Sequence, residues 1–257
     1  GEGGDPQITR PARSLAEVPV FLVSPSRVLV PGARRSIHCY DTSLLGALEA
    51  ARESGGMIAH IPWSANDSEG GRKMTMGVGV LATVIKETSS TKDNKFGEES
   101  PSLVVDVLAT TRVRVKKVLG YEPYVRAELE EIPLLPGPDE ATDMETTELW
   151  KAVTILQKEL GLPASPPTAD GRADDTVADL STAPALLRAS NEASFEEDNA
   201  ASERAARALA ALAAVAPESR AEGLMLSGSK LGEFVMEQLT EVRARLLAMK
   251  SLSGLGK

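Results

Sequence analysis

Cysteine is nearly missing from this sequence, because Cys39 is the single one among 257 residues. One cysteine cannot form a disulfide within the chain, and this fits a reducing compartment better than a disulfide-stabilised secreted domain. A reactive thiol at Cys39 is an alternative, although a small strand residue is the simpler interpretation.

Aromatic residues are also scarce, and the net charge of the chain is negative. Aromatic side chains make up 4% of the sequence, and the formal net charge is −9 at pH 7. Binding of nucleic acid begins with basic charge that displaces counterions, and single strands are commonly held by stacking on aromatic rings. The composition therefore argues against a nucleic-acid partner and predicts an aliphatic, alanine-rich core.

No long apolar run is present. The longest alanine- and leucine-rich stretch, residues 205–216, contains Arg207 and is shorter than the roughly 18 apolar residues that a membrane span requires. We therefore expect a soluble or peripheral protein that reaches a membrane only through a partner. With 42% apolar and 25% charged residues, the chain has the composition of one large or two modest globular domains.

Motifs for nucleotide hydrolysis and peptide cleavage are missing as well. No Gly-x-x-x-x-Gly-Lys-Ser/Thr phosphate loop occurs, and the only Gly-Lys pair is Gly256-Lys257 at the end of the sequence. Ser229 and Lys230 are adjacent, which is poor geometry for a Ser–Lys peptidase dyad and fits a helix N-terminus better. We expect no catalytic residues and no cofactor.

A metal site has little support. His38 and His60 both lie on expected strands, with Cys39 and Asp41 close to the first of them. Neither a His-x-x-x-His nor a Cys-x-x-Cys spacing is present, so we interpret the histidines as ordinary strand residues and expect no metal.

The folded part of the sequence opens with extended, largely apolar residues. The run at 18–30 is broken at Ser24-Pro25-Ser26, is ended by the Pro31-Gly32 dipeptide, and is followed by residues 37–41. This pattern predicts two short strands and a tight turn.

Further elements are predicted by apolar spacing and by polar breaks. A helix at 42–54 and strands at 57–61, 76–85 and 103–132 are expected, with polar loops at 64–73 and 87–101. Helices are expected at 142–160, 177–190, 194–216 and 222–252. Residues 1–15 read as a polar tail, and residues 163–176 as an acidic, proline-rich insertion.

The strand at 103–132 has a strongly basic pattern. Val113 and Val115 alternate with Arg112, Arg114 and Lys116, which predicts three cations on one strand face. The simplest interpretation is the solvated face of a half-buried sheet. Contact with a protein, with RNA or with another anion is the alternative use of this face.

Several of these segments, in this order, resemble the N-terminal domain of Lon proteases. The matching stretches are the Val-Leu-Val-Pro-Gly turn at 28–32, Gly-Val-Gly-Val-Leu-Ala-Thr-Val-Ile at 77–85, and the segments at 107–115 and 121–129. The resemblance covers roughly residues 16–135, with a weaker similarity in the helical part. Two departures are His38–Asp41 in place of the family's Phe-Glu-x-Arg-Tyr, and Ala109 in place of a glycine.

The resemblance marks Pro31, Gly32, Gly77, Gly79 and Arg112 as structural residues of the family motifs. Alternate glycines in a strand allow a sharp bend or the close approach of another backbone. For Arg112 the resemblance implies that its guanidinium holds a strand or loop end, with ligand binding as the alternative.

The implied fold is α+β. A small, partly open PUA-like β-barrel of about six strands is expected over residues 16–138, followed by a helical bundle over 139–257. The implied function is that of a stand-alone member without ATPase or peptidase domains, a non-enzymatic module that binds other proteins. It would act as an adaptor or accessory subunit of an assembly, with partner segments held in apolar grooves between barrel and bundle.

Two alternatives stay open. The first alternative to the adaptor role is a substrate receptor that delivers unfolded proteins to a separate protease. The second is an RNA-binding PUA-like protein. Similar stand-alone proteins occur in bacteria and plastids, and the Gly-rich, acidic start at Gly1 is compatible with a cleaved precursor. We therefore expect a chloroplast location, with the cytoplasm as the alternative.

Overall fold

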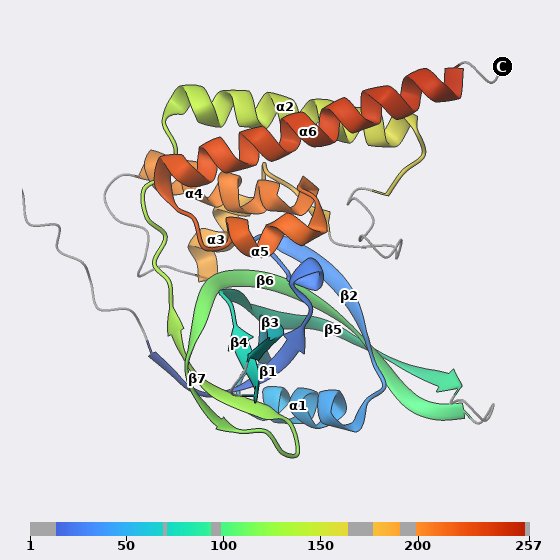
Figure 1. Cartoon of the computed structure of the whole chain (residues 1–257). Helices are drawn as coiled ribbons and strands as arrows, with labels where there is room; N and C mark the ends of the chain where they lie inside the picture. Colours follow the sequence, from blue (N-terminus) through green and yellow to red (C-terminus); the bar gives the residue numbers. More distant parts are fainter. Residues whose placement is uncertain (1–13, 69–70, 94–98, 164–176, 191–198, 255–257) are drawn as a thin grey trace, which may run out of the picture.

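The computed structural model describes residues 14–68, 71–93, 99–163, 177–190 and 199–254. Strands from the first half of the chain form a curved sheet, and helices from the second half lie against one side of it (Figure 1). The predicted insertion, apart from Pro163, and the predicted tail, apart from its last two residues, lie outside the described residues.

Five strands are hydrogen-bonded in a closed circuit. Each pairs with two others in the order β1, β3, β5, β6, β7 and back to β1, and only the β1–β3 contact is parallel. The strands are β1 (Ser14–Val23), β3 (Met57–Ser68), β5 (Gly79–Asp93), β6 (Glu99–Gly120) and β7 (Val125–Glu131).

Three further strands extend this circuit outward. The strand β2 (Ala33–Cys39) pairs with β6, β8 (Val177–Ala178) pairs with β2, and β4 (Gly71–Met76) pairs with β3. The described part of the chain thus has an eight-stranded sheet rather than about six strands. The predicted small, partly open barrel followed by helices is confirmed, with the strands in a ring rather than a regular barrel.

Two apolar cores result from the alternation of side chains along the ring strands. The inner core is a cluster of small and branched aliphatic residues to which all five ring strands contribute: Val18, Val20, Ala59, Ile61, Leu81, Val113, Ala127 and Leu129. Neighbouring residues such as Phe21, Ile58 and Val80 point the other way and belong to a larger core that also includes the helices. Scarce aromatic residues are compatible with this ring because its interior is small.

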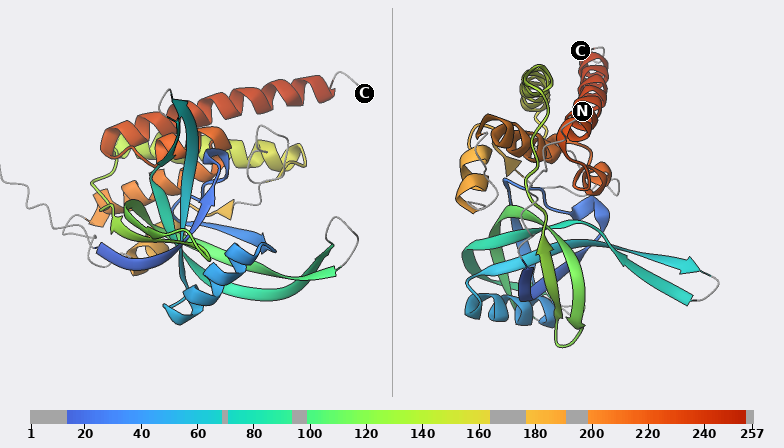
Figure 2. Two further views of the ribbon diagram at one scale, coloured as in Figure 1. Left: turned by 60° about the horizontal axis from the view of Figure 1, so that its bottom comes forward. Right: turned by 90° about the vertical axis from the view of Figure 1, so that its left-hand side faces the viewer.

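The helix α1 (Thr42–Glu53) covers the end of the ring opposite the bundle (Figures 1 and 2). It begins where Asp41 accepts a hydrogen bond of 2.8 Å from the backbone N–H of Ser43, an ordinary N-cap. Its buried face consists of Ala47, Leu48 and Ala51, as the predicted spacing requires.

The C-terminal helices are α2 (Glu140–Glu159), α3 (Ala183–Ser190), α4 (Asn199–Ala211), α5 (Arg220–Gly223) and α6 (Gly228–Gly254). The helices α2 and α6 lie side by side and run in the same direction (Figures 1 and 2). Near their C-terminal ends, Lys250 Nζ of α6 donates a hydrogen bond of 2.7 Å to Glu159 Oε2 of α2. The helix predicted at 142–160 is confirmed, whereas the one predicted from 222 begins at 228 after the short α5.

The polar stretches predicted as loops are strands, and that prediction is wrong. Residues 64–68 and 71–73 belong to the β3–β4 hairpin, and residues 87–93 and 99–101 to the β5–β6 hairpin. Beyond the ring the β5–β6 hairpin projects as a two-stranded ribbon (Figure 2). Residues 85–89 and 91 are exposed on both faces of this ribbon, so their sequence shows no apolar alternation, although threonine and backbone pairing favour the strand.

Candidate functional site

The Pro31-Gly32 turn lies where the ring meets the bundle. Gly32 has φ +81°, and its N–H donates a hydrogen bond of 2.9 Å to the carbonyl oxygen of Ala109. A Cβ added at Gly32 would lie 3.1 Å from Cβ of Ala183 and 3.3 Å from Cβ of Ala210. The turn therefore needs glycine both for its backbone conformation and for close contact with α3 and α4.

Arg112 lies at the same junction and is buried, with 4% of its surface exposed. Its guanidinium donates hydrogen bonds to three carbonyl oxygens, those of Leu224 at 3.1 Å, Leu226 at 2.6 Å and Pro133 at 3.4 Å. Burial lowers the pKa of Arg112 to about 10, so the side chain is still a cation at neutral pH. The cation ties β6 to the segments that follow β7 and precede α6.

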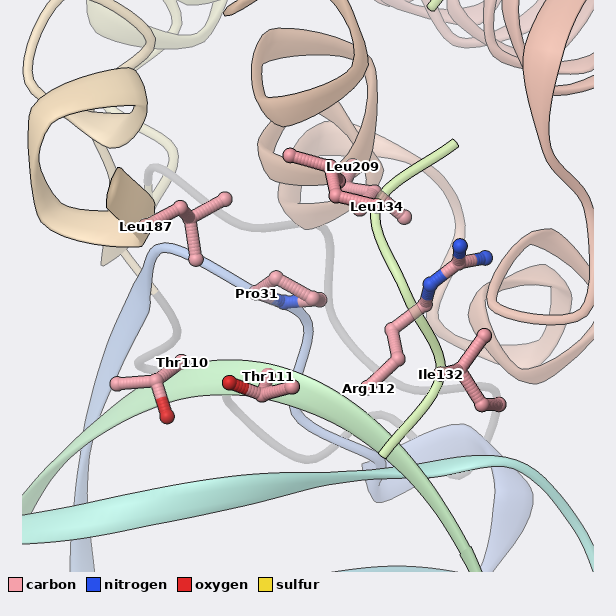
Figure 3. Close-up of a pocket in the computed structure, with 8 residues that line it drawn as sticks. All are labelled: Pro31, Thr110, Thr111, Arg112, Ile132, Leu134, Leu187 and Leu209. Carbon is pink, nitrogen blue, oxygen red and sulfur yellow. The ribbon is translucent and has the colours of Figure 1, made fainter. Parts of the chain in front are cut away.

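A small cavity adjoins Arg112 (Figure 3). Its volume is about 10 Å³, which is about enough for one water molecule. The lining residues come from both the ring and the bundle: Pro31, Thr110, Thr111, Arg112, Ile132, Leu134, Leu187 and Leu209. A cavity of this size is too small for a partner segment, so the groove expected between barrel and bundle is not found at these residues.

A second buried arginine, Arg220, was not singled out from the sequence. It is fully buried at the start of α5 and donates hydrogen bonds to the carbonyl oxygens of Leu212, Ala213 and Val215 at 3.1, 2.8 and 3.3 Å. These carbonyls belong to the 3-10 turn η3 (Leu212–Ala214) and the residue after it. Arg220 therefore satisfies backbone acceptors within the bundle, which is a structural role.

Gly77 and Gly79, which lie just before and at the start of β5, allow two backbones to approach closely. A Cβ added at Gly79 would lie 2.3 Å from the carbonyl oxygen of His60 and 2.9 Å from Cα of Ile61. Two residues earlier, Gly77 N–H donates a hydrogen bond of 2.8 Å to the carbonyl oxygen of Pro62. Both glycines let the start of β5 lie close against β3, with which it pairs antiparallel, so their role is structural.

The three cations predicted on one face are separated by the structure. Arg112 is buried at the junction, whereas Arg114 and Lys116 are exposed further along β6. Arg114 Nε donates to Glu130 Oε2 at 2.5 Å, and Lys116 Nζ to Glu128 Oε1 at 2.7 Å. These hydrogen bonds raise the pKa of Arg114 and Lys116 and lower the pKa of both glutamates.

A third pair continues this row of ion pairs, since Arg126 Nη1 of β7 donates to Glu17 Oε1 of β1 at 2.9 Å. The outer face of β6, β7 and β1 thus alternates in sign and neutralises its own charge. Such a face offers little to a polyanion, because counterion release needs unpaired basic charge.

The histidines and the cysteine have structural surroundings, and His38 Nε2 lies at a hydrogen-bond distance of 2.7 Å from Ser102 Oγ. His60 is buried, and its Nδ1 accepts a hydrogen bond of 3.3 Å from Leu29 N–H. Burial, followed by the nearby charges of Arg35 and Arg27, lowers the pKa of His60 to about 3. Burial raises the pKa of Cys39 to about 11, which keeps it a thiol. Within the described ranges, no group of three or more His, Cys, Asp or Glu side chains is placed to hold a metal.

The projecting ribbon has two open edges. Among the described residues, β5 pairs with β3 only up to Thr83, and from there to Asp93 it pairs with β6 alone. On the other strand, residues 99–102 pair only with β5, and pairing with β2 begins at Leu103. We call the paired residues 88–93 and 99–102 the arm. Its backbone N–H and C=O groups on both edges have no neighbouring strand in the described chain.

The side chains at residues 88–91 leave the β5 edge of the arm accessible. Residues 88–91 are Thr-Ser-Ser-Thr, with small hydroxyl side chains and no charge, and three of the four are exposed. Sheet edges are usually protected by lysine, proline or a covering segment, and the arm has Lys92 and Pro101 outside residues 88–91. At the base of the arm Glu87 is held in a bidentate ion pair with Arg52 of α1. The arm is therefore a candidate surface for an additional strand.

No helix in the described part of the chain is long and apolar enough to cross a membrane. The structure is that of an α+β protein in which a ring of strands carries a helical bundle and an open-edged arm. The sequence matches the family model of the ATP-dependent protease La (LON) substrate-binding domain over residues 17–222. The chain therefore belongs to this family, and the predicted relationship to Lon N-terminal domains is confirmed.

Two solved structures are similar. One is the N-terminal domain of Lon protease from the Mycobacterium avium complex, with 14% identity, a TM-score of 0.49, and coverage of 87% of this chain and 98% of that chain. The other is a Lon N-terminal domain protein from Xanthomonas campestris, with 15% identity, a TM-score of 0.36, and coverage of 58% of this chain and 83% of that chain. No curated protein matches the sequence.

Proposed function

We propose that this protein is a non-enzymatic module that binds extended segments of other proteins at the open edges of its arm. The family to which the chain belongs is described as a substrate-binding domain, which supports a role in binding protein substrates. The observation that carries the proposal is the pairing of β5, which from Ile85 to Asp93 has a strand on one side only.

Strand addition suits this edge for a physical reason. A two-stranded ribbon is marginally stable in water, and a third strand would satisfy its unpaired backbone groups. Affinity then comes from main-chain hydrogen bonds, and the small hydroxyl side chains of Thr88–Thr91 impose little side-chain selection. The edge of β4, which pairs only with β3 among the described residues, offers a second site of the same kind.

Binding by strand addition favours the role of a substrate receptor over that of an adaptor or accessory subunit. A receptor that delivers unfolded proteins to a separate protease needs tolerance of sequence, which backbone recognition provides. An adaptor or accessory subunit of a fixed assembly would need a surface that recognises one partner by its side chains. The self-neutralising ion pairs on β6 and β7 count against RNA binding. A plastid location is part of the proposal and rests on the sequence alone.

The test uses fluorescently labelled, reduced and carboxymethylated α-lactalbumin, which stays unfolded, with the native form for comparison. Anisotropy is expected to show binding of the unfolded form only. The variant Thr88→Lys/Ser90→Lys places charge on the edge and is expected to weaken binding by roughly fivefold or more. The control Thr240→Lys/Ser251→Lys adds the same charge at exposed sites on α6 and is expected to bind normally.

Equal affinity of the arm variant and the wild type would show that the edge is not the site. No binding of the unfolded protein would reject the receptor role itself. The labelled protein should also remain intact on a gel after incubation with and without ATP, as a non-enzymatic module requires.

A further inference from the structure

The solvent face of α2 carries an ordered stripe of four residues, which we call the α2 stripe: Met144, Glu148, Lys151 and Ile155. Their spacing of four, three and four residues places them in one row along the helix. Met144 is 62% exposed and Ile155 is 58% exposed. Both are among the large apolar side chains of the described chain that are exposed to solvent.

The stripe lies opposite the face by which α2 packs in its own molecule. That inner face is buried through Thr146, Val153, Leu156 and Gln157. The helix lies on the far side of the bundle from the ring, as Figures 1 and 2 show. Glu148 and Lys151 form no ion pair with another residue of the described chain, unlike the charged residues on β6 and β7.

The order of residues in the stripe is self-complementary. When two copies of α2 lie antiparallel about a two-fold axis between residues 149 and 150, Met144 faces Ile155 of the second copy. In the same alignment Glu148 faces Lys151 of the second copy, and the reciprocal contacts follow from the symmetry. The spacing also matches an antiparallel coiled coil, in which each layer combines one residue from each helix. Two apolar layers therefore enclose two layers of opposite charge.

We propose that the α2 stripe is the contact between two copies of this chain, with their α2 helices antiparallel. The partner is a second copy of the chain, because a reversed copy of the stripe places apolar residues opposite apolar residues and Glu148 opposite Lys151. Four layers bury less area than the roughly 1,200 Å² of a standard interface, so the dimer is a weak one. Its dissociation constant is expected on the order of 100 μM. The inference does not depend on the arm.

Sedimentation equilibrium of the whole chain tests the contact. Either Glu148→Lys or Lys151→Glu alone converts both charged layers into like-charge layers, and each is expected to weaken the dimer roughly tenfold. An equal mixture of these two variants pairs lysine with glutamate in both layers and should regain the wild-type affinity as a heterodimer. The double variant Glu148→Lys/Lys151→Glu should likewise regain it as a homodimer.

The matched control is Glu53→Lys, an exposed charge reversal on α1 at the opposite end of the molecule. It is expected to dimerise like the wild type. A wild type that is monomeric up to several times the expected dissociation constant overturns the proposal. So does a dimer that the single reversals leave unchanged, or a mixture that fails to regain affinity.

Discussion

Arg112 on β6 donates a hydrogen bond of 2.6 Å to the carbonyl oxygen of Leu226, 114 residues further along the chain. The bond joins the strand ring to the loop that precedes α6. Because the guanidinium is buried and reaches three carbonyl oxygens, it is a buried polar connection between the two halves of the molecule, in addition to the pairing of β8 with β2.

Replacing Arg112 by methionine is expected to lower the free energy of unfolding by about 2–3 kcal/mol. The substitution removes the charge and leaves carbonyl oxygens without a donor, which costs more than the lost packing. Urea unfolding followed by circular dichroism measures the change. The control Arg114→Met removes an exposed ion pair and should cost less than about 1 kcal/mol. Equal losses for the two variants would contradict the role given to Arg112.

Gly79→Ala is expected to destabilise the ring by about 3 kcal/mol or more. The added Cβ would lie 2.3 Å from the carbonyl oxygen of His60, and a backbone atom in a paired strand cannot move away easily. Gly46→Ala is the comparison, because its Cβ would be 3.4 Å from Tyr124 Cδ1 and it lies within a helix. That variant should be neutral or slightly stabilising, as thermal unfolding of both would show.

His60 is expected to make stability fall as the pH is lowered from 7 to 5. The pKa of His60 is about 3 in the folded chain, whereas its ordinary value is 6.5. Between these two pH values the unfolded state binds a proton at this residue and the folded state does not. The stability that the neutral imidazole contributes is present above pH 6.5 and is lost as the pH falls towards 3. The loss amounts to about 1–2 kcal/mol between pH 6.5 and 5.

The variant His60→Asn isolates this effect, because the Asn oxygen can accept from Leu29 N–H without titrating. Urea unfolding at several pH values between 5 and 7 should give a shallower pH dependence for the variant than for the wild type. Parallel curves would show that His60 is not the group responsible.

Apolar alternation predicted strands of the ring, and the resemblance to Lon N-terminal domains implied that they form a small barrel. Strand alternation placed Val113 on the face opposite Arg112, which is the inner core in the structure, and helical spacing predicted α1 and α2. Each of these elements buries one face, and a single buried face leaves a periodic pattern that can be recognised.

The remaining errors have a common physical origin. Thr88, Ser89 and Thr91 of the arm are exposed, so Thr88–Thr91 have the composition of a loop although they form a strand. Alternation assigned Arg112, Arg114 and Lys116 to one face, but it could not show that the bundle covers this face only at Arg112. Nothing near Arg220 in the sequence indicates that carbonyl oxygens surround it. Each outcome depends on contacts between segments that are distant in sequence.

Closure of the ring between β1 and β7 also sets an order of events during synthesis of the chain. The first ring strand has no antiparallel neighbour until Val125–Glu131 has been made, because Val18 pairs with Ala127. The edge of β1 that pairs with β7 therefore stays uncovered until more than a hundred further residues have been synthesised. Contacts of such long range form slowly, so the nascent chain passes through a stage in which its own aliphatic strands are exposed to chaperones.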